Sequence, residues 1–301
     1  MADLRRDYPA EFVFRQYIDQ VLTPRVASDT VWHYTSATGV LGIVEHRELW
    51  ASSVVTLNDS EEILHGLRII ESCASEQGAS RAAALVTTWI RDARAKLNAF
   101  DLADSYVLSA SLDGESQTQF AIYGKYAVGL NSGMRLTKAT AMPGVVPMTA
   151  AFELGWRQVL YGDEEKLAHV KRLLQVLGTF ADEQVRSSNH RPDIYDTAVD
   201  FIVRVAAHLK HRRFAHEEEV RLYGRGDPTG AEVFFRARGE VIVPFIKIQA
   251  DGSDRRLPLR GVNVGYGLDY EMAEIGLKTA LRLNGYDRSP LAIRNVAGSR
   301  R

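Results

Sequence analysis

Strand-like segments near both ends of the chain enclose a helical stretch, and this order constrains the fold most strongly. Apolar and polar positions alternate in short segments up to residue 161 and again after residue 219, whereas residues 164–213 carry helical periodicity. No segment rich in proline, glycine and serine separates these parts, and no internal repeat is visible. The pattern predicts one α+β domain with a helical insertion.

The expected limits follow from this pattern. We expect an N-terminal helical extension over 1–29, the α+β domain over 30–290 with its insertion at about 164–213, and a C-terminal tail over 291–301. The expected strands cover 30–34, 49–53, 105–111, 126–130, 145–154, 156–161, 219–223, 233–236, 241–248 and 261–265. The expected helices cover 10–22, 39–45, 80–99, 117–123, 164–176, 193–213, 270–284, and a segment that begins at an Asp59 or Ser60 cap and ends near 76.

Composition excludes several classes of protein. The 301 residues are 46% hydrophobic and 25% charged, which is typical of a globular chain, and the net charge of -1 provides no general attraction to nucleic acid or to an anionic membrane. The single Cys73 cannot form an internal disulfide, and no zinc-type spacing of Cys and His is present. Without a signal peptide or an apolar run that spans a bilayer, we expect a cytoplasmic protein that uses no metal and no membrane.

The first candidate site follows the strand at 30–34. His33 and Thr35 fall on one side of an extended strand and Trp32 and Tyr34 on the other. Polar residues that end a strand just before a helix can converge on a ligand. The alternative is structural: Thr35 or Ser36 caps the helix, and His33 is a partly buried histidine with satisfied hydrogen bonds.

A second candidate site begins the strand at 219. If Glu219 starts this strand, Glu217, Glu219 and Arg221 alternate to one face, where one carboxylate pairs with Arg221 and the other remains available. The alternative is a solvated, charged strand edge that follows the basic run at 210–213.

Hydroxyl and aromatic side chains in the middle of the chain add further candidates. Ser109 and Ser111 share one face of their strand and can bind a ribose or phosphate, or satisfy neighbouring backbone groups. Tyr123 can stack on a planar ring or pack in the core. Asn58 and Asp59 first serve a turn and a helix cap.

Taken in order, these motifs resemble a large, mostly bacterial family that is catalogued as a domain of unknown function. The resemblance covers roughly residues 30–290. It rests on His33-Tyr34-Thr35, Leu49-Trp50-Ala51-Ser52, Asn58-Asp59-Ser60-Glu61-Glu62, Ala110-Ser111, Phe120 to Tyr123 with Tyr126 to Leu130, and Glu217-Glu218-Glu219-Val220-Arg221. Ala110, Phe120 and Val220 replace a Phe and two Trp residues of the family pattern at packing positions.

The opening unit is also similar to the first strand and helix of ADP-ribosyltransferases, a resemblance that implies a split β-sheet core and NAD as the substrate. It implies that His33 binds the adenosine-side ribose, that Ser111 or Tyr123 supports the nicotinamide end, and that Glu219 is catalytic. Glu217 and Glu219 together resemble the Glu-x-Glu of arginine-specific members, in which the first Glu assists the acceptor.

These resemblances imply a coherent chemistry. A carboxylate at Glu219 would stabilise the oxocarbenium ion that forms when the nicotinamide–ribose bond breaks, and Glu217 would act as a base for an acceptor. Tyr34 and Tyr123 would flank the nicotinamide, and Thr35 and Arg221 would complete the NAD-binding residues.

We therefore expect an NAD-dependent ADP-ribosyltransferase or NAD glycohydrolase that modifies a protein or nucleic acid, as a toxin, effector or phage-defence protein. One alternative is an inactive nucleotide-binding or interaction module on the same scaffold. A second is a nucleic-acid-processing protein that binds through Lys210, His211, Arg212 and Arg213. Histidines 208, 211 and 216 lack a convincing third ligand position for a metal.

Overall fold

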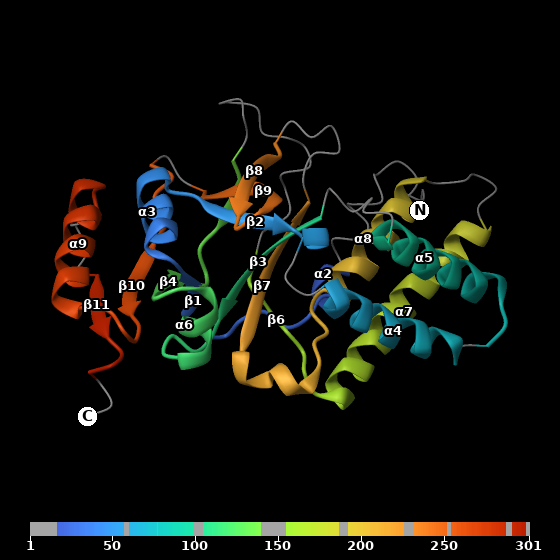
Figure 1. The fold of residues 1–301 in the computed structure, drawn as a ribbon. Helices are drawn as coiled ribbons and strands as arrows, with labels where there is room; N and C mark the ends of the chain where they lie inside the picture. The colour runs from blue at the N-terminus through green and yellow to red at the C-terminus, as the bar shows by residue number, and fades with distance from the viewer. Residues whose placement is uncertain are drawn as a thin grey trace. The chain divides into compact units, whose positions relative to one another are not determined.

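The chain folds into two compact units (Figure 1). The computed structural model describes residues 17–56, 60–76, 78–98, 105–139, 155–186, 192–225, 232–251, 254–286 and 291–298. The helical unit comprises Met1–Pro24, Leu57–Leu102 and Arg157–Ala215. The sheet unit comprises Arg25–Thr56, Ala103–Trp156 and His216–Arg301.

The sheet unit is built on one mixed sheet. Its strands are β1 (Thr30–Thr35), β2 (Leu49–Ser53), β3 (Ser105–Ser111), β4 (Tyr126–Asn131), β5 (Leu136–Lys138), β7 (Glu219–Arg225), β8 (Phe234–Arg238), β9 (Val241–Ala250), β10 (Leu259–Val264) and β11 (Ala292–Asn295). They follow the order β11-β10-β4-β1-β3-β2-β9-β5, with β7 beside β3 and β8 beside β9. β10 and β11 are parallel, whereas the other pairs in this order are antiparallel.

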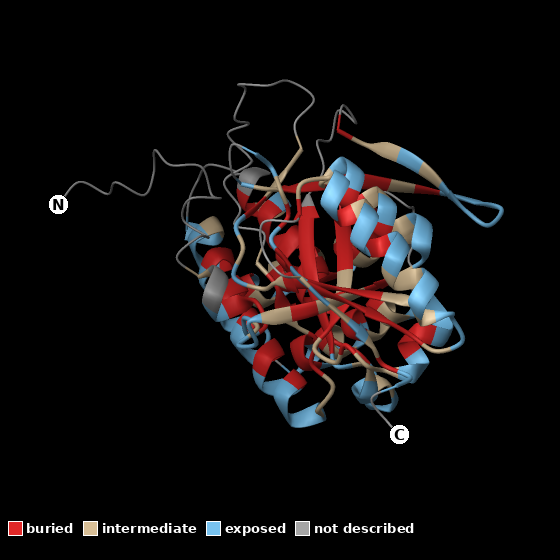
Figure 2. Cartoon of the chain, turned by 90° about the vertical axis from the view of Figure 1, so that its left-hand side faces the viewer, coloured by how far each residue is buried: buried red, intermediate tan, exposed pale blue. Residues whose placement is uncertain are grey.

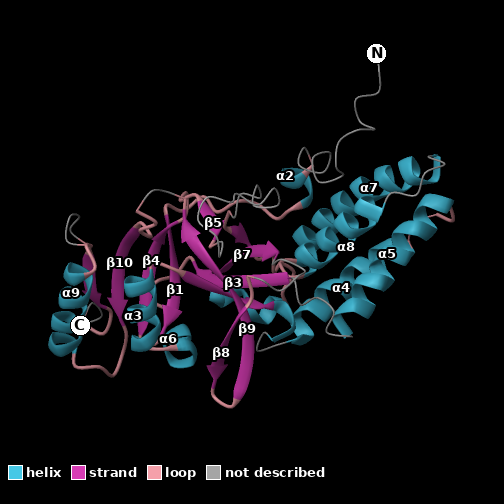
Figure 3. Cartoon of the chain, turned by 90° about the horizontal axis from the view of Figure 1, so that it is seen from above, coloured by secondary structure: helices cyan, strands magenta, loops and turns pink. Residues whose placement is uncertain are grey.

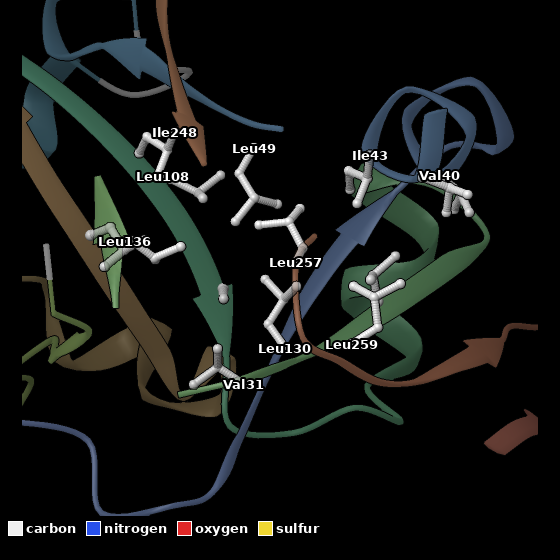
Figure 4. Close-up of a cluster of buried hydrophobic side chains, with 14 of the residues drawn as sticks. Val31, Val40, Ile43, Leu49, Leu108, Leu130, Leu136, Ile248, Leu257 and Leu259 are labelled. Carbon is white, nitrogen blue, oxygen red and sulfur yellow. The ribbon is translucent and has the colours of Figure 1, made fainter. Parts of the chain in front are cut away.

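The main core of the sheet unit lies where α3 (Ala37–His46) and α9 (Tyr270–Leu283) pack on the sheet. Val40 of α3 and Leu277 of α9 belong to the same buried cluster as the strand residue Val31, and Figure 4 shows part of this cluster. A smaller cluster joins Tyr34 of β1 to α6 (Gln117–Tyr123). Since Val31 and Tyr34 are three residues apart on one strand, they point to opposite faces, so the sheet is covered on both sides. Buried strands and exposed outer helix surfaces reflect this layering (Figure 2).

The sheet forks at β3. One edge of β3 pairs with β7 over its whole length. The other edge pairs with β2 at Tyr106 and Val107 and with β1 at Ser111. Between these two pairings, residues 108–110 have no strand partner on that edge within the described part of the chain. We call this gap between β1 and β2 the fork.

The helical unit packs four long helices against one another, as Figure 3 shows. It contains α2 (Ile18–Val21), α4 (Ser60–Ser75), α5 (Arg81–Asn98), α7 (Asp163–Arg186), α8 (Pro192–Ala206) and the short strand β6 (Arg157–Gln158). Short 3-10 helices are η2 (Val54–Thr56) in the sheet unit and η4 (Arg212–Glu217), where the chain passes from the helical unit to the sheet unit. Gly66 brings α4 close to α8, because a Cβ atom there would lie 2.2 Å from the carbonyl oxygen of Ala206.

The α+β class predicted from the sequence is confirmed, and most strand limits agree to within two residues. The predicted insertion at 164–213 belongs to a unit that also contains residues 57–102. Among the described residues, no helix combines the length and the apolar character needed to cross a membrane.

Several predicted limits are wrong. The helix predicted over 193–213 ends at Ala206, because the chain then turns and Leu209 forms a β-bridge with Leu160. The helix predicted over 164–176 continues to Arg186, because Leu177 and Phe180 extend its buried stripe. The strand predicted over 156–161 is reduced to β6.

Other parts of the prediction are incomplete or fall beyond the described residues. β5 and β11 were not predicted. The strand predicted over 145–154 and the Asn58-Asp59 turn lie outside the described residues, as does most of the helix predicted over 10–22.

We expect Gly66→Ala to lower the free energy of unfolding by about 1–3 kcal/mol, because the added methyl group must displace the backbone of α8. Chemical denaturation followed by circular dichroism measures the change. Gly178→Ala in α7 is the matched control, since a Cβ atom at Gly178 meets no atom within 4 Å. This control should gain about 0.5–1 kcal/mol from helix propensity. A Gly66→Ala variant as stable as Gly178→Ala would contradict the close approach.

Candidate functional site

His33 fills the fork. Its Nδ1 atom lies 2.9 Å from the carbonyl oxygen of Ser109, on the edge of β3 that carries no strand partner at this point. A carbonyl oxygen only accepts, so Nδ1 carries the proton and donates. Burial lowers the pKa of His33 below its usual value, and the positive charge of Arg236 lowers it further. The imidazole is therefore neutral at pH 7, and its Nε2 atom can accept a hydrogen bond.

Glu219 lies on the other edge of β3, beside the fork. Trp32 of β1 is registered with Ser111, and Ser111 is registered with Glu219 of β7. Because neighbouring strands are about 5 Å apart, the backbones of Trp32 and Glu219 are about 10 Å apart across β3. The fold thus brings His33 and Glu219, which are almost 190 residues apart in the sequence, to one end of β3.

Glu219 forms a two-point ion pair with Arg221 of the same strand. Arg221 Nε lies 2.7 Å from Oε1 of Glu219, and the Nη2 atom of Arg221 lies 2.8 Å from Oε2. Both residues are buried, with exposed fractions of 8% for Glu219 and 4% for Arg221. The interpretation of this strand as a solvated, charged edge is therefore wrong. The predicted pairing of one carboxylate with Arg221 is confirmed, and the paired carboxylate is that of Glu219.

Glu217 does not share the strand with Glu219, and the prediction that it alternates onto the same strand face is wrong. It ends the short 3-10 helix η4, and Glu218 then adopts a positive φ of 43° before β7 begins. This turn breaks the alternation on which the prediction depended. The Glu217 backbone still reaches β3, because its carbonyl oxygen accepts a hydrogen bond from the Ser111 hydroxyl at 2.7 Å.

Ser111 satisfies the backbone around the site. Its hydroxyl donates to the carbonyl oxygen of Glu217 and accepts from the amide of Asp113 at 3.1 Å. Ser111 is buried, and its hydroxyl satisfies neighbouring backbone groups, which is the second of the two roles expected for this serine. Ser109 is half-buried, and its carbonyl oxygen holds His33.

Tyr34 and Trp32 pack beneath the site. The Tyr34 ring lies 4.9 Å from the ring of Phe120, edge to face, and its hydroxyl donates to the carbonyl oxygen of Asp113 at 2.7 Å. The same hydroxyl accepts from the amide of Ser116, and burial raises the pKa of Tyr34 well above its usual value. Trp32 covers Gly114, where a Cβ atom would lie 2.5 Å from the indole. These contacts hold the loop at 113–116.

Thr35 ends β1 just before α3 begins, and Tyr123 is the last residue of α6. Ser36 is the N-cap of α3, since its hydroxyl accepts from the amide of Gly39 at 3.2 Å, and Thr35 Oγ1 lies against the same glycine. This settles the choice between Thr35 and Ser36 as the cap. Tyr123 ends α6 and is 44% exposed, so its interpretation as a core residue is wrong.

Arg236 is a member of the site that the sequence did not reveal. It projects from β8, donates from Nη2 to the hydroxyl of Ser52 at 2.8 Å, and lies close enough to His33 to lower the pKa of that histidine. The only sequence signal was Leu-Trp-x-Ser in the family pattern, to which no role had been assigned. The arginine itself comes from β8, 184 residues after Ser52 in the chain.

The basic run at 210–213 is not a continuous surface patch. Lys210 is 5% exposed, and its ammonium group lies 2.8 Å from Glu62 and 4.8 Å from the ring centroid of Phe214. Arg212 and Arg213 are exposed. Within the part of the chain that the structure describes, no group of His, Cys, Asp and Glu is arranged to hold a metal ion.

Comparison with protein-family models, with curated proteins and with solved structures gives no match to this chain. Function is therefore inferred from the residues of the fork and their contacts.

We expect nuclear magnetic resonance titration to give a pKa for His33 below 6.5. Between that pKa and 6.5 the unfolded state binds more protons than the folded state, so the free energy of unfolding falls as the pH drops through this window. His33→Gln should remove this share of the pH dependence. Arg236→Gln should raise the pKa of His33, because a nearby positive charge is lost.

Arg238→Gln is the control for that shift in pKa. It removes the same charge from the same strand, two residues after Arg236, where the Arg238 side chain binds the carbonyl oxygen of Thr56. Equal shifts of the His33 pKa in both variants would show that Arg236 does not act from within the fork.

We expect Arg221→Met to lower the free energy of unfolding by about 3–5 kcal/mol, because it removes the guanidinium from a buried carboxylate. Arg68→Met breaks an exposed Arg–Glu pair with Glu61 and should cost less than about 1 kcal/mol. Denaturant titration of both variants provides the comparison. Similar small losses would mean that the Glu219–Arg221 pair is not structural.

Proposed function

We propose that the chain is an NAD-dependent ADP-ribosyltransferase whose site is the fork of the sheet. The observation that carries the proposal is that His33 and Glu219 lie against the same strand: His33 is held on β3 through Ser109, and Glu219 belongs to β7, which pairs with the opposite edge of β3. The order of His33, Ser111 and Glu219 along the chain, and the resemblance in motifs, support the same assignment. An ADP-ribosyltransferase-like split sheet is part of this proposal.

His33 is suited to bind a ribose. A neutral imidazole whose Nδ1 proton is committed to the carbonyl oxygen of Ser109 presents Nε2 as an acceptor for a hydroxyl group. The hydrogen bond to the backbone also fixes the plane of the ring. The residue therefore acts by holding a hydroxyl in place, and it needs no change of charge during the reaction.

Glu219 is suited to stabilise positive charge on the ribose. When the bond between C1′ of the ribose and the nicotinamide nitrogen breaks, the electron pair leaves with nicotinamide and an oxocarbenium ion develops. A carboxylate that accepts a hydrogen bond from the 2′-hydroxyl is more strongly bound in that transition state than in the ground state. The two contacts from Arg221 hold the carboxylate in a single orientation.

The remaining candidate residues divide into ligand contacts and support. Tyr123 offers an exposed ring for stacking on nicotinamide, whereas Tyr34, which was also expected to stack, is occupied by Phe120 and by the loop at 113–116. Glu217, half-buried at the end of η4, is the candidate base that takes the proton from an acceptor nucleophile as it bonds to C1′. Thr35 supports the turn into α3.

We expect purified protein to release nicotinamide from NAD in the presence of a cell lysate and to transfer the labelled ADP-ribose to a macromolecule. Glu219→Gln should lower kcat at least about 100-fold, because it removes the charge that opposes the oxocarbenium ion. His33→Gln should mainly raise KM. Glu274→Gln, which changes a half-buried carboxylate on α9 paired with Lys278, is the control and should retain full activity.

The alternatives predict other results. An inactive module on the same scaffold would bind NAD or ADP-ribose without releasing nicotinamide, and Glu219→Gln would behave as the unaltered protein does. A nucleic-acid-processing protein would lose binding when Arg212 and Arg213 are replaced, not when His33 is. Either outcome would refute the proposed transferase.

A further inference from the structure

The guanidinium of Arg236 lies over the rings of Trp50 and Phe245, beside the fork, and we call these two rings the aromatic platform. Its guanidinium carbon lies 5.7 Å from the ring centroid of Trp50 and 5.9 Å from that of Phe245. The two rings stack on each other with centroids 4.5 Å apart, and Ser52 accepts a hydrogen bond from Nη2 of the arginine. Cation–π contacts and one hydrogen bond therefore position the planar group before any ligand arrives.

The charge of Arg236 has no anionic counterpart within the described part of the chain. The Nε atom is buried and has no hydrogen-bond partner there, and no carboxylate lies within ion-pair distance of the side chain. In contrast, Arg221 on the neighbouring part of the same sheet is paired at two points with Glu219. A desolvated cation that lacks a partner is costly, unless an anion that binds there compensates for it.

Ser52, which contacts Arg236, lies on the same face of the sheet as Glu219 and Arg221. Ser52 is registered with Val107 on β3, and residues 107, 109 and 111 of an extended strand point to one side. Ser109 and Ser111 are registered with Arg221 and Glu219. The proximity of Arg236 to His33, which accounts for part of the lowered pKa of that histidine, agrees with this placement.

We infer that Arg236 and Ser52 form a binding site for a phosphate group of the ligand. In naming the ligand as the diphosphate of a dinucleotide, the inference rests on the proposed function. Free inorganic phosphate or pyrophosphate has the same chemistry. A guanidinium offers parallel donors that match two phosphate oxygens, and the Ser52 hydroxyl can rotate to give its proton to a third.

The inference assigns a role to the Leu-Trp-x-Ser motif, which the catalytic proposal leaves unused. Trp50 of this motif contacts the guanidinium of Arg236 with its ring, and Ser52 accepts a hydrogen bond from it. His33 remains neutral next to this cation, so the fork carries one fixed positive charge for the diphosphate and one uncharged acceptor for the adjoining ribose. The sheet unit can thus distinguish a phosphorylated ligand from a nucleoside.

Isothermal titration calorimetry of the full chain with ADP-ribose, pyrophosphate and adenosine tests the inference. We expect the unaltered protein to bind ADP-ribose and, more weakly, pyrophosphate. Arg236→Gln should weaken ADP-ribose binding at least about 10-fold and abolish pyrophosphate binding, since it removes a charge-assisted two-point contact. Any binding of adenosine should be unchanged.

Two further variants separate a direct contact from general electrostatics and from misfolding. Arg238→Gln removes the same charge from the same strand and should change ADP-ribose affinity much less than Arg236→Gln does. Arg236→Lys keeps the positive charge without the planar guanidinium, so an intermediate loss of affinity is expected in a chain that retains the half-buried cation. If Arg236→Gln fails to fold, the Lys variant carries the comparison.

The outcomes are distinguishable from those of the proposed function. If ADP-ribose affinity is unchanged in Arg236→Gln and Arg236→Lys, or falls equally in Arg238→Gln, or if the unaltered protein binds neither ADP-ribose nor pyrophosphate, the phosphate site is refuted. Glu219→Gln should still bind pyrophosphate. Phosphate binding through Arg236 without nicotinamide release would retain the site and refute the transferase.

Discussion

The edge of β3 at residues 108–110 is the constraint on which the site depends. A strand edge presents amide and carbonyl groups that need partners when water is excluded. Both β1 and β2 use this edge, one at Ser111 and the other at Val107 and Tyr106, and neither fills the space between. The imidazole of His33 supplies the missing donor to Ser109. A side chain thus replaces a strand at the fork.

This arrangement explains why a histidine at the fork is held rigidly. Its position follows from a backbone hydrogen bond, and its neutral state follows from burial and from the cation of Arg236. The same fork has β7 on its far side, where Glu219 and Arg221 neutralise each other. The charges of the site are therefore unevenly distributed, with the Glu219–Arg221 ion pair on one edge of β3 and, on the other, a guanidinium that forms no ion pair with a described residue.

Local chemistry made part of the site predictable. The alternation of polar and apolar residues predicted the limits of β3, and Glu219 does begin a strand. The sequence also predicted the cap of α3, although it could not choose between Thr35 and Ser36, because both hydroxyls lie within reach of the first helical turn. Glu217 does not share the strand face of Glu219, because a positive φ at Glu218 interrupts the alternation of side chains that the sequence pattern predicts.

The α+β class, the strands around the fork and the candidate residues His33 and Glu219 follow from periodicity and residue type, which act over a few positions. The pairing of β3 with three other strands, the commitment of Tyr34 to a loop and the arrival of Arg236 beside His33 follow from tertiary contacts. Each joins segments 53 or more residues apart, and no local rule relates the side chains of such segments until a common sheet places them in register.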